Sequence, residues 1–141
     1  MGRISRGLRN LNPGNIRRGN FRYKGECATS TDAEFRQFES IEWGYRAMFV
    51  VLHTYATKHH CHTIRAMVSR YAPRSENDTE SYIRRVCRRT HLEADTPLDT
   101  LDGETMIEIV AAMSEVENGA TATRRDVANG WQLFFDDFGS I

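Results

Sequence analysis

The chain has 141 residues, of which 40% are hydrophobic, and its 19 Lys and Arg residues balance 19 Asp and Glu residues. This length and composition predict one globular domain over residues 1–141 and exclude a disordered or strongly charged chain. The longest apolar stretch, residues 47–52, is too short to span a bilayer, so we expect no membrane association. The basic N-terminus leads into a turn and not into an apolar run, so no signal peptide is expected.

The balanced charge is unevenly distributed along the chain. Residues 1–91 contain 17 Lys and Arg and 8 Asp and Glu, a net charge of +9, and residues 92–141 carry a net charge of −9. One interpretation is complementary packing of the two parts, and the other is a basic face that binds an anionic polymer. The sequence contains no nucleic-acid-binding motif, so nucleic acid is not an expected partner.

The first 38 residues are rich in turn signals. Asn12–Asn15 contains an Asn-Pro-Gly-Asn run, and Gly19-Asn20 is a second turn signal. Aromatic and branched residues with β propensity lie between these turns. We therefore expect a small two- or three-stranded sheet, including a β-hairpin, near the N-terminus.

The rest of the chain has the apolar periodicity of helices. Ser40, Asp78 and Asp102 are predicted N-cap residues, and Pro73 should end the second helix. The predicted helices cover residues 40–58, 63–71, 79–89, 103–118 and 123–128, the last one leading through Gly130 into an aromatic tail. The expected fold is α+β and mainly helical, with five or six helices.

Glu117 is the most unusual residue of these helices. It lies on the same apolar stripe as Val110 and Met113, in the last turn of a helix that ends at Asn118-Gly119. Burial and the negative end of the helix dipole should each raise its pKa, which is what a general acid requires. The alternative interpretation is a partly exposed carboxylate that pairs with an arginine.

Other groups carry weaker signals. Asp32 and Glu34 are candidates for a second carboxylate, and residues 71–82 offer polar groups around two tyrosines for sugar binding or for a capped loop. Cys61 lies among the histidines of residues 59–62, but the unpaired spacing of the three cysteines favours reduced thiols over a metal site. The motifs of serine hydrolases, phosphate-binding loops and zinc proteases are absent from the sequence.

Three motifs resemble a family of phage and prophage proteins, labelled virion structural proteins or endolysin-like proteins. They are the run Arg9–Arg17, then Phe35 and Phe38-Glu39-Ser40 with Gly44 and Ala47 downstream, and Tyr71-Ala72-Pro73 followed by residues 76–79 and Tyr82. The resemblance covers residues 7–119.

A more distant similarity is to the glucosaminidases and lytic transglycosylases of the lysozyme superfamily. In those domains a helix that ends in Glu-Ser-Gly precedes an Asn-rich turn. Here the corresponding helix comes last and ends in Glu-Asn-Gly at residues 117–119. This order suggests a circular permutation and places Glu117 beside the Asn12–Asn15 turn.

The resemblance implies a lysozyme-like domain that degrades peptidoglycan as a muramidase, glucosaminidase or lytic transglycosylase. Glu117 would be the general acid, Tyr82 would steady the developing positive charge, and Asp32 would serve a hydrolase as the second carboxylate. The implied substrate-binding residues are Asn12, Asn15, Tyr71, Asn77 and Asn118. A cofactor or metal is not expected. The rival interpretation is a non-catalytic phage virion structural or binding protein with the same fold.

The resemblance also implies partners and a location. The expected partners are peptidoglycan glycan strands, with other virion proteins as further candidates. The expected location is the cytoplasm of the producing host, followed by release to the cell wall or carriage in the phage particle.

Overall fold

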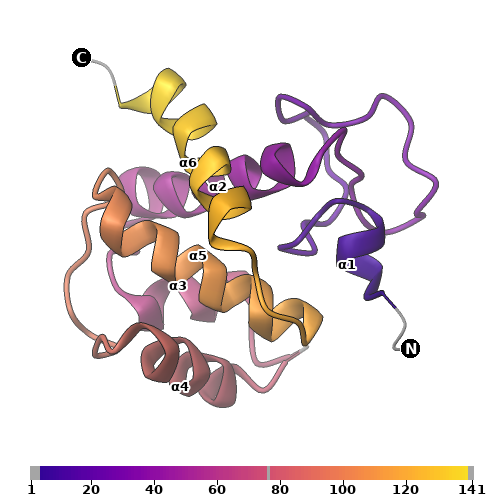
Figure 1. The fold of residues 1–141 in the computed structure, drawn as a ribbon. Coiled ribbons are helices and arrows are strands. Elements are labelled where there is room, and N and C mark those ends of the chain that lie inside the picture. Colours follow the sequence, from indigo (N-terminus) through magenta and orange to yellow (C-terminus); the bar gives the residue numbers. More distant parts are fainter. Residues whose placement is uncertain (1–3, 76, 140–141) are drawn as a thin grey trace.

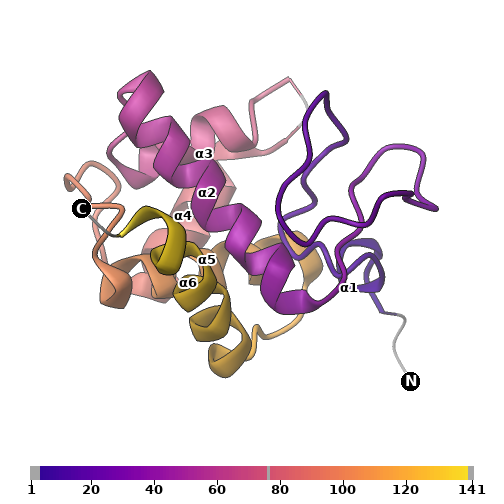
Figure 2. The same cartoon turned by 90° about the horizontal axis from the view of Figure 1, so that it is seen from above.

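The computed structural model describes residues 4–75 and 77–139, and the helices that follow residue 40 lie to one side of an irregular N-terminal segment that contains one short helix (Figures 1 and 2). The helices in these residues are α1 (Arg6–Arg9), α2 (Ile41–His59), α3 (Ile64–Tyr71), α4 (Thr79–Thr90), α5 (Gly103–Asn118) and α6 (Arg124–Phe138). None of the helices in this part of the chain combines the length and the apolar character that a membrane crossing requires.

The predicted α+β fold, with its β-hairpin near the N-terminus, is wrong. Within the described residues, regular structure is entirely helical, and residues 10–40 form a series of turns. Two isolated antiparallel bridges are the remnants of strand pairing there, and they join Arg17 to Phe35 and Glu26 to Phe38. A single bridge cannot sustain a ladder of hydrogen bonds, so no sheet forms.

Arg36 explains why these residues do not pair as strands. Its side chain is 3% exposed, and its guanidinium donates to the backbone oxygens of Arg17 (2.9 Å) and Phe21 (2.6 Å). It also pairs with the Glu26 carboxylate at 2.5 Å. The guanidinium therefore satisfies carbonyls that would otherwise need a neighbouring strand. The β-prone segment folds around a buried arginine.

The predicted boundaries of α2, α3, α4 and α5 are confirmed. The signals that predicted them act over only a few residues. Ser40 accepts a hydrogen bond from the Trp43 N–H at the start of α2, and Asp78 accepts one from the Ser81 N–H at the start of α4. Helix α5 ends at Gly119, whose φ of 64° is left-handed as predicted.

Both ends of the helical order differ from the prediction. Helix α1 was not expected, and α6 continues through Gly130 to Phe138. Gly130 is buried where α6 crosses α2, and an added Cβ would lie 2.5 Å from the Tyr45 Cβ and 3.0 Å from the Glu42 carbonyl oxygen. The glycine therefore permits close packing of two helices and does not end one of them.

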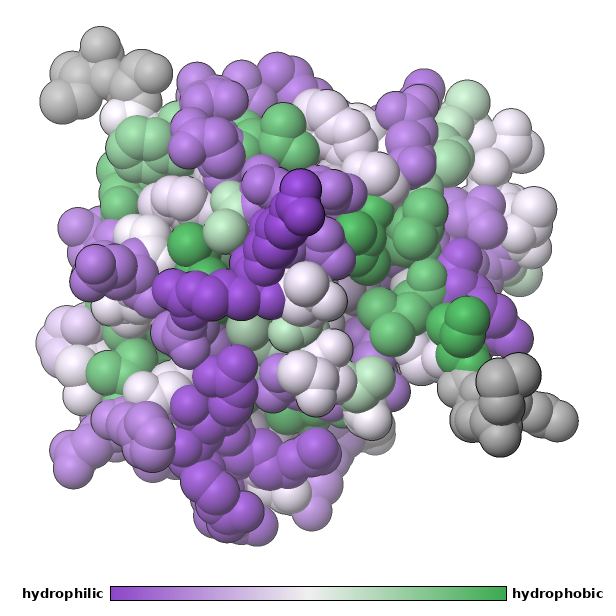
Figure 3. Space-filling model, in the orientation of Figure 1, coloured by the Kyte–Doolittle hydropathy of each residue, from purple (hydrophilic) through white to green (hydrophobic). Residues whose placement is uncertain are grey.

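The core lies between α2, α5 and α6, with α3 and α4 packed around it. Its largest fully buried side chains include Met48, Phe49, Leu52, Met106, Ile109, Met113 and Phe134. The face seen in Figure 3 is mainly hydrophilic, with small hydrophobic areas near the two ends of the described chain. This core fixes the C-terminal end of α5, which faces the N-terminal segment (Figure 1).

Candidate functional site

Asn118 joins the end of α5 to the Asn12–Asn15 turn. Its side-chain nitrogen donates to the Pro13 carbonyl oxygen at 2.8 Å and to the Ser114 carbonyl oxygen at 2.9 Å. Its side-chain oxygen accepts a hydrogen bond from the Ser5 hydroxyl at 2.7 Å. The Asn118 amide thus joins two segments that lie far apart in the sequence.

Glu117 lies beside this junction. One of its carboxylate oxygens accepts a hydrogen bond from the Asn15 amide at 2.9 Å, and the other accepts one from the Tyr82 hydroxyl at 3.0 Å. Burial raises the pKa of Glu117, and the hydrogen bonds from Asn15 and Tyr82 offset part of that rise. Among the described residues no cation forms an ion pair with Glu117. The site therefore differs from the alternative interpretation, in which this carboxylate pairs with an arginine.

A pocket of about 160 Å³ opens beside this carboxyl group. We call it the Glu117 pocket, and its lining consists of Gly14, Asn15, Arg17, Phe35, Tyr71, Ala72, Asn77 and Glu117. Asn15 has a left-handed φ of 49°, which asparagine tolerates better than most residues and which belongs to the turn that presents its amide. Polar side chains dominate this lining, and Glu117 lies on the wall formed by α5.

Two tyrosines surround the acid as neutral groups. Burial and the neighbouring Glu117 charge raise the pKa values of both Tyr71 and Tyr82 well above the usual value. The Tyr71 hydroxyl donates to the Gly14 carbonyl oxygen, which ties α3 to the same turn. Both phenols therefore keep their protons at neutral pH and act as hydrogen-bond donors.

Glycines allow the turn to approach so closely. An added Cβ at Gly7 would lie 2.5 Å from the side-chain oxygen of Asn118 and 2.7 Å from that of Asn15. An added Cβ at Gly44, on α2, would lie 2.2 Å from the Leu11 carbonyl oxygen. Sequence reasoning did not assign Gly7 to the site. The available signal was a glycine beside a polar turn, which is weak by itself.

The second carboxylate lies elsewhere. Both oxygens of Asp32 accept hydrogen bonds from the Arg6 guanidinium at 2.7 Å, and Asn10 donates to one of them at 3.0 Å. These bonds hold the pKa of Asp32 well below its usual range, chiefly through Arg6. Glu34 is more exposed and pairs with Arg6 and Arg17. Neither carboxylate lines the Glu117 pocket.

The other predicted site residues divide into two groups. Tyr71 and Asn77 line the Glu117 pocket, and Asn118 adjoins it through the turn. Asn12 is fully buried, and its side chain bonds to the backbone of Ile16 and Arg36. Asn12 therefore shapes the turn from within and does not line the pocket.

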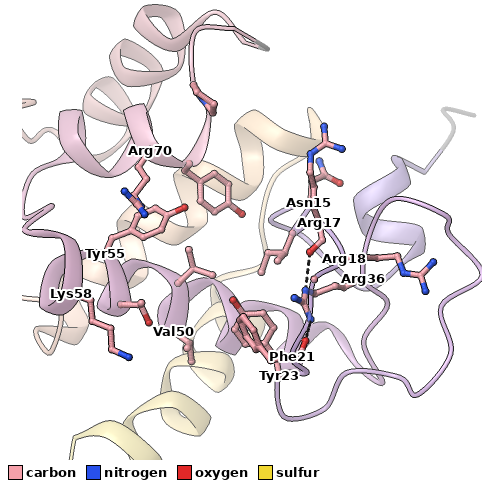
Figure 4. A pocket seen from close by; sticks show the side chains of 16 residues that line it. Asn15, Arg17, Arg18, Phe21, Tyr23, Arg36, Val50, Tyr55, Lys58 and Arg70 are labelled. Carbon is pink, nitrogen blue, oxygen red and sulfur yellow. Dashed lines mark hydrogen bonds between the residues drawn. The ribbon is translucent and has the colours of Figure 1, made fainter.

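A larger pocket of about 750 Å³ adjoins the first and shares Asn15, Arg17 and Tyr71 with it. It lies between the helical side, formed by α2 and α3, and residues 15–23 with Arg36 (Figure 4). We call it the basic pocket because its cationic lining residues are Arg17, Arg18, Arg36, Lys58 and Arg70.

Comparison with known proteins relates this chain to a phage protein. The chain is 35% identical over 135 residues to Protein P5 of Pseudoalteromonas phage PM2, an alignment that covers 93% of this chain and 82% of that protein. This chain belongs to the family of that phage protein. Membership confirms the phage part of the resemblance, whereas the relative's name states no activity. The chain matches no protein-family model.

Proposed function

We propose that this phage protein cleaves glycosidic bonds of peptidoglycan, with Glu117 as the general acid. The proposal depends on one observation: a largely buried carboxyl group on a pocket wall is held by two neutral donors, Asn15 and Tyr82, instead of by a cation. A cation would fix the carboxyl in its ionised form, whereas burial favours the protonated form that can donate.

The chemistry follows from these contacts. Protonated Glu117 gives its proton to the glycosidic oxygen as the bond from that oxygen to the anomeric carbon breaks. The carboxylate that remains is stabilised by the Asn15 amide and the Tyr82 hydroxyl. It then accepts the proton of the hydroxyl that bonds to the anomeric carbon, which returns Glu117 to its starting form.

The attacking hydroxyl is supplied by the sugar itself in this proposal. Glu117 is the one carboxylate in the described lining of its pocket, and Asp32 is engaged by Arg6. A hydrolase commonly uses a second carboxylate to direct a water or to form a covalent intermediate. Attack by the 6-hydroxyl of the cleaved sugar needs no such group, and it yields an anhydro-sugar.

The test is turbidity loss of purified peptidoglycan with the wild type, Glu117→Gln and the matched control Glu104→Gln. Glu104 is exposed in the first turn of the same helix. We expect Glu117→Gln to lower the rate at least about 100-fold and Glu104→Gln to leave it unchanged. Mass spectrometry of the products should show an anhydro-sugar, whereas a reducing end would indicate hydrolysis assisted by a second carboxylate.

Two results would count against the proposal. Equal rates for Glu117→Gln and the wild type would dispose of Glu117 as the acid. No turbidity loss with any of the three proteins would favour the non-catalytic virion protein.

A further inference from the structure

The basic pocket has an unusual charge for a site beside a glycan-binding acid. Its described lining contains five cationic side chains and no carboxylate. Aromatic and aliphatic groups, among them Phe21, Tyr55 and Val50, form most of the remaining walls (Figure 4). An uncharged glycan supplies nothing to neutralise such a lining, so the pocket fits a ligand that carries carboxylates and apolar groups together.

The cations differ in how far they are already used. Arg36 is buried and bonded to backbone oxygens, and Arg18 reaches the carbonyl oxygens of residues 32 and 33. Lys58 is exposed, and its ammonium group makes no hydrogen bond or ion pair within the described part of the chain. Arg70 stacks 5.3 Å from the ring centre of Tyr55 and has no carboxylate partner among those residues. Lys58 and Arg70 therefore offer the charges that a ligand can neutralise.

The position of the basic pocket beside the Glu117 pocket indicates what kind of ligand it would meet. It shares Asn15, Arg17 and Tyr71 with the Glu117 pocket, so a ligand in it can be covalently continuous with a sugar beside Glu117. In peptidoglycan, alternate sugars carry a short peptide stem that contains both free carboxylates and alanine methyl groups. A volume of about 750 Å³ is of the size that accommodates such a short segment.

We infer that the basic pocket binds the acidic peptide stem of peptidoglycan, with Lys58 and Arg70 as specificity-determining residues. This inference rests on the proposed function, because the stem is located by the sugar at Glu117. It makes stem-bearing peptidoglycan the preferred substrate over glycan from which the stems have been removed. Binding to the stem should also weaken as salt is added, because the charges lie at an open pocket.

The experiment measures binding separately from cleavage. Soluble glycan fragments are titrated into Glu117→Gln protein by calorimetry, either with their stems intact or after an amidase has removed the stems and left a single lactyl carboxylate in place of each. The same titration is repeated after Lys58→Gln and Arg70→Gln are added together. A matched control adds Arg84→Gln and Arg88→Gln, which remove the same charge from the exposed side of α4, outside both pockets.

We expect the stem-bearing fragment to bind more tightly than the stem-free one. The Lys58 and Arg70 changes should weaken its binding about 5- to 20-fold, as for two partly exposed ion pairs, and should change stem-free binding less than about twofold. Equal affinity for the two fragments, or an equal loss in the Arg84 and Arg88 control, would overturn the inference. A single-stranded DNA that displaces the stem-bearing fragment at equal affinity would do so too, by showing unselective anion binding. Calorimetry measures binding and not cleavage, so its result is independent of the Glu117 assignment. If that assignment is wrong, the separate turbidity assay shows it, because Glu117→Gln then retains wild-type turbidity loss.

Discussion

The hydroxyl of Tyr82 should control how readily Glu117 loses its proton. Tyr82→Phe removes the donor that lies 3.0 Å from the carboxylate while leaving the ring in its buried position. A hydrogen bond to a charged group contributes about 1.5–3 kcal/mol, and a water that enters from the adjoining pocket would offset part of that loss. We therefore take about 1.5 kcal/mol, which lowers the ratio of ionised to protonated carboxyl roughly tenfold at a given pH.

The variant should thus raise the pKa of Glu117 further above its usual value. The assay is a pH titration of carboxyl-labelled glutamate by carbon NMR, with the Glu117 signal assigned by its absence in Glu117→Gln. Tyr45→Phe is the matched control, because its hydroxyl bonds to Ser114 at 3.2 Å and does not contact Glu117. If Tyr82→Phe leaves the Glu117 titration unchanged or moves it to lower pH, the hydrogen bond does not stabilise the ionised acid and the reasoning is refuted.

Three further predictions concern stability. Because burial raises the folded-state pKa of Glu117, the stability that it contributes is complete below the unfolded-state pKa and is lost as pH rises through the folded-state pKa. The free energy of unfolding in urea should therefore rise for Glu117→Gln relative to the wild type from pH 4 to 7. A gain that runs the other way would contradict the raised pKa. Gly130→Ala should destabilise the protein by about 1–3 kcal/mol, since its Cβ would press on Tyr45, whereas the exposed Asn129→Ala should change thermal unfolding little; equal melting temperatures would refute the close helix crossing. Because the pKa of Asp32 is depressed, its carboxylate stabilises the fold at pH values above its usual pKa near 3.8, and this stability is lost in acid. Asp32→Asn should therefore be less stable than the wild type at neutral pH, lose less stability on acidification and keep its turbidity-clearing activity. Loss of that activity in a folded Asp32→Asn protein would return Asp32 to the catalytic group.

What could be predicted from the sequence depended on the range of the interaction. The α5 helix and its Gly119 end were predictable, because periodicity and cap residues act within a few positions. The sheet was wrongly predicted, because β propensity in residues 16–38 gives way to a buried arginine whose partners lie 10 to 19 residues away. The predicted end of the last helix at residue 128 was wrong, because nothing local reveals that Gly130 lies against α2, with Tyr45 2.5 Å from its missing Cβ.

The candidate site shows the same division. The apolar position of Glu117 was visible from helix periodicity, but its contact with Asn15 spans 102 residues and was expected only from the order of motifs in a resembling family. The ion pair that occupies Asp32 depends on Arg6, 26 residues away, and no local pattern indicates it. Sequence therefore singled out Glu117, and the fold determined which groups surround it.

The junction at Asn118 has a consequence for synthesis on the ribosome. The turn that contributes Pro13 is made early, and the amide that holds it is made 105 residues later. Throughout that interval the nascent chain has the Asn15 donor but neither Glu117 nor the end of α5. Glu117 thus meets Asn15 only after its own segment has been synthesised, so the proposed site cannot form while translation is still upstream of α5.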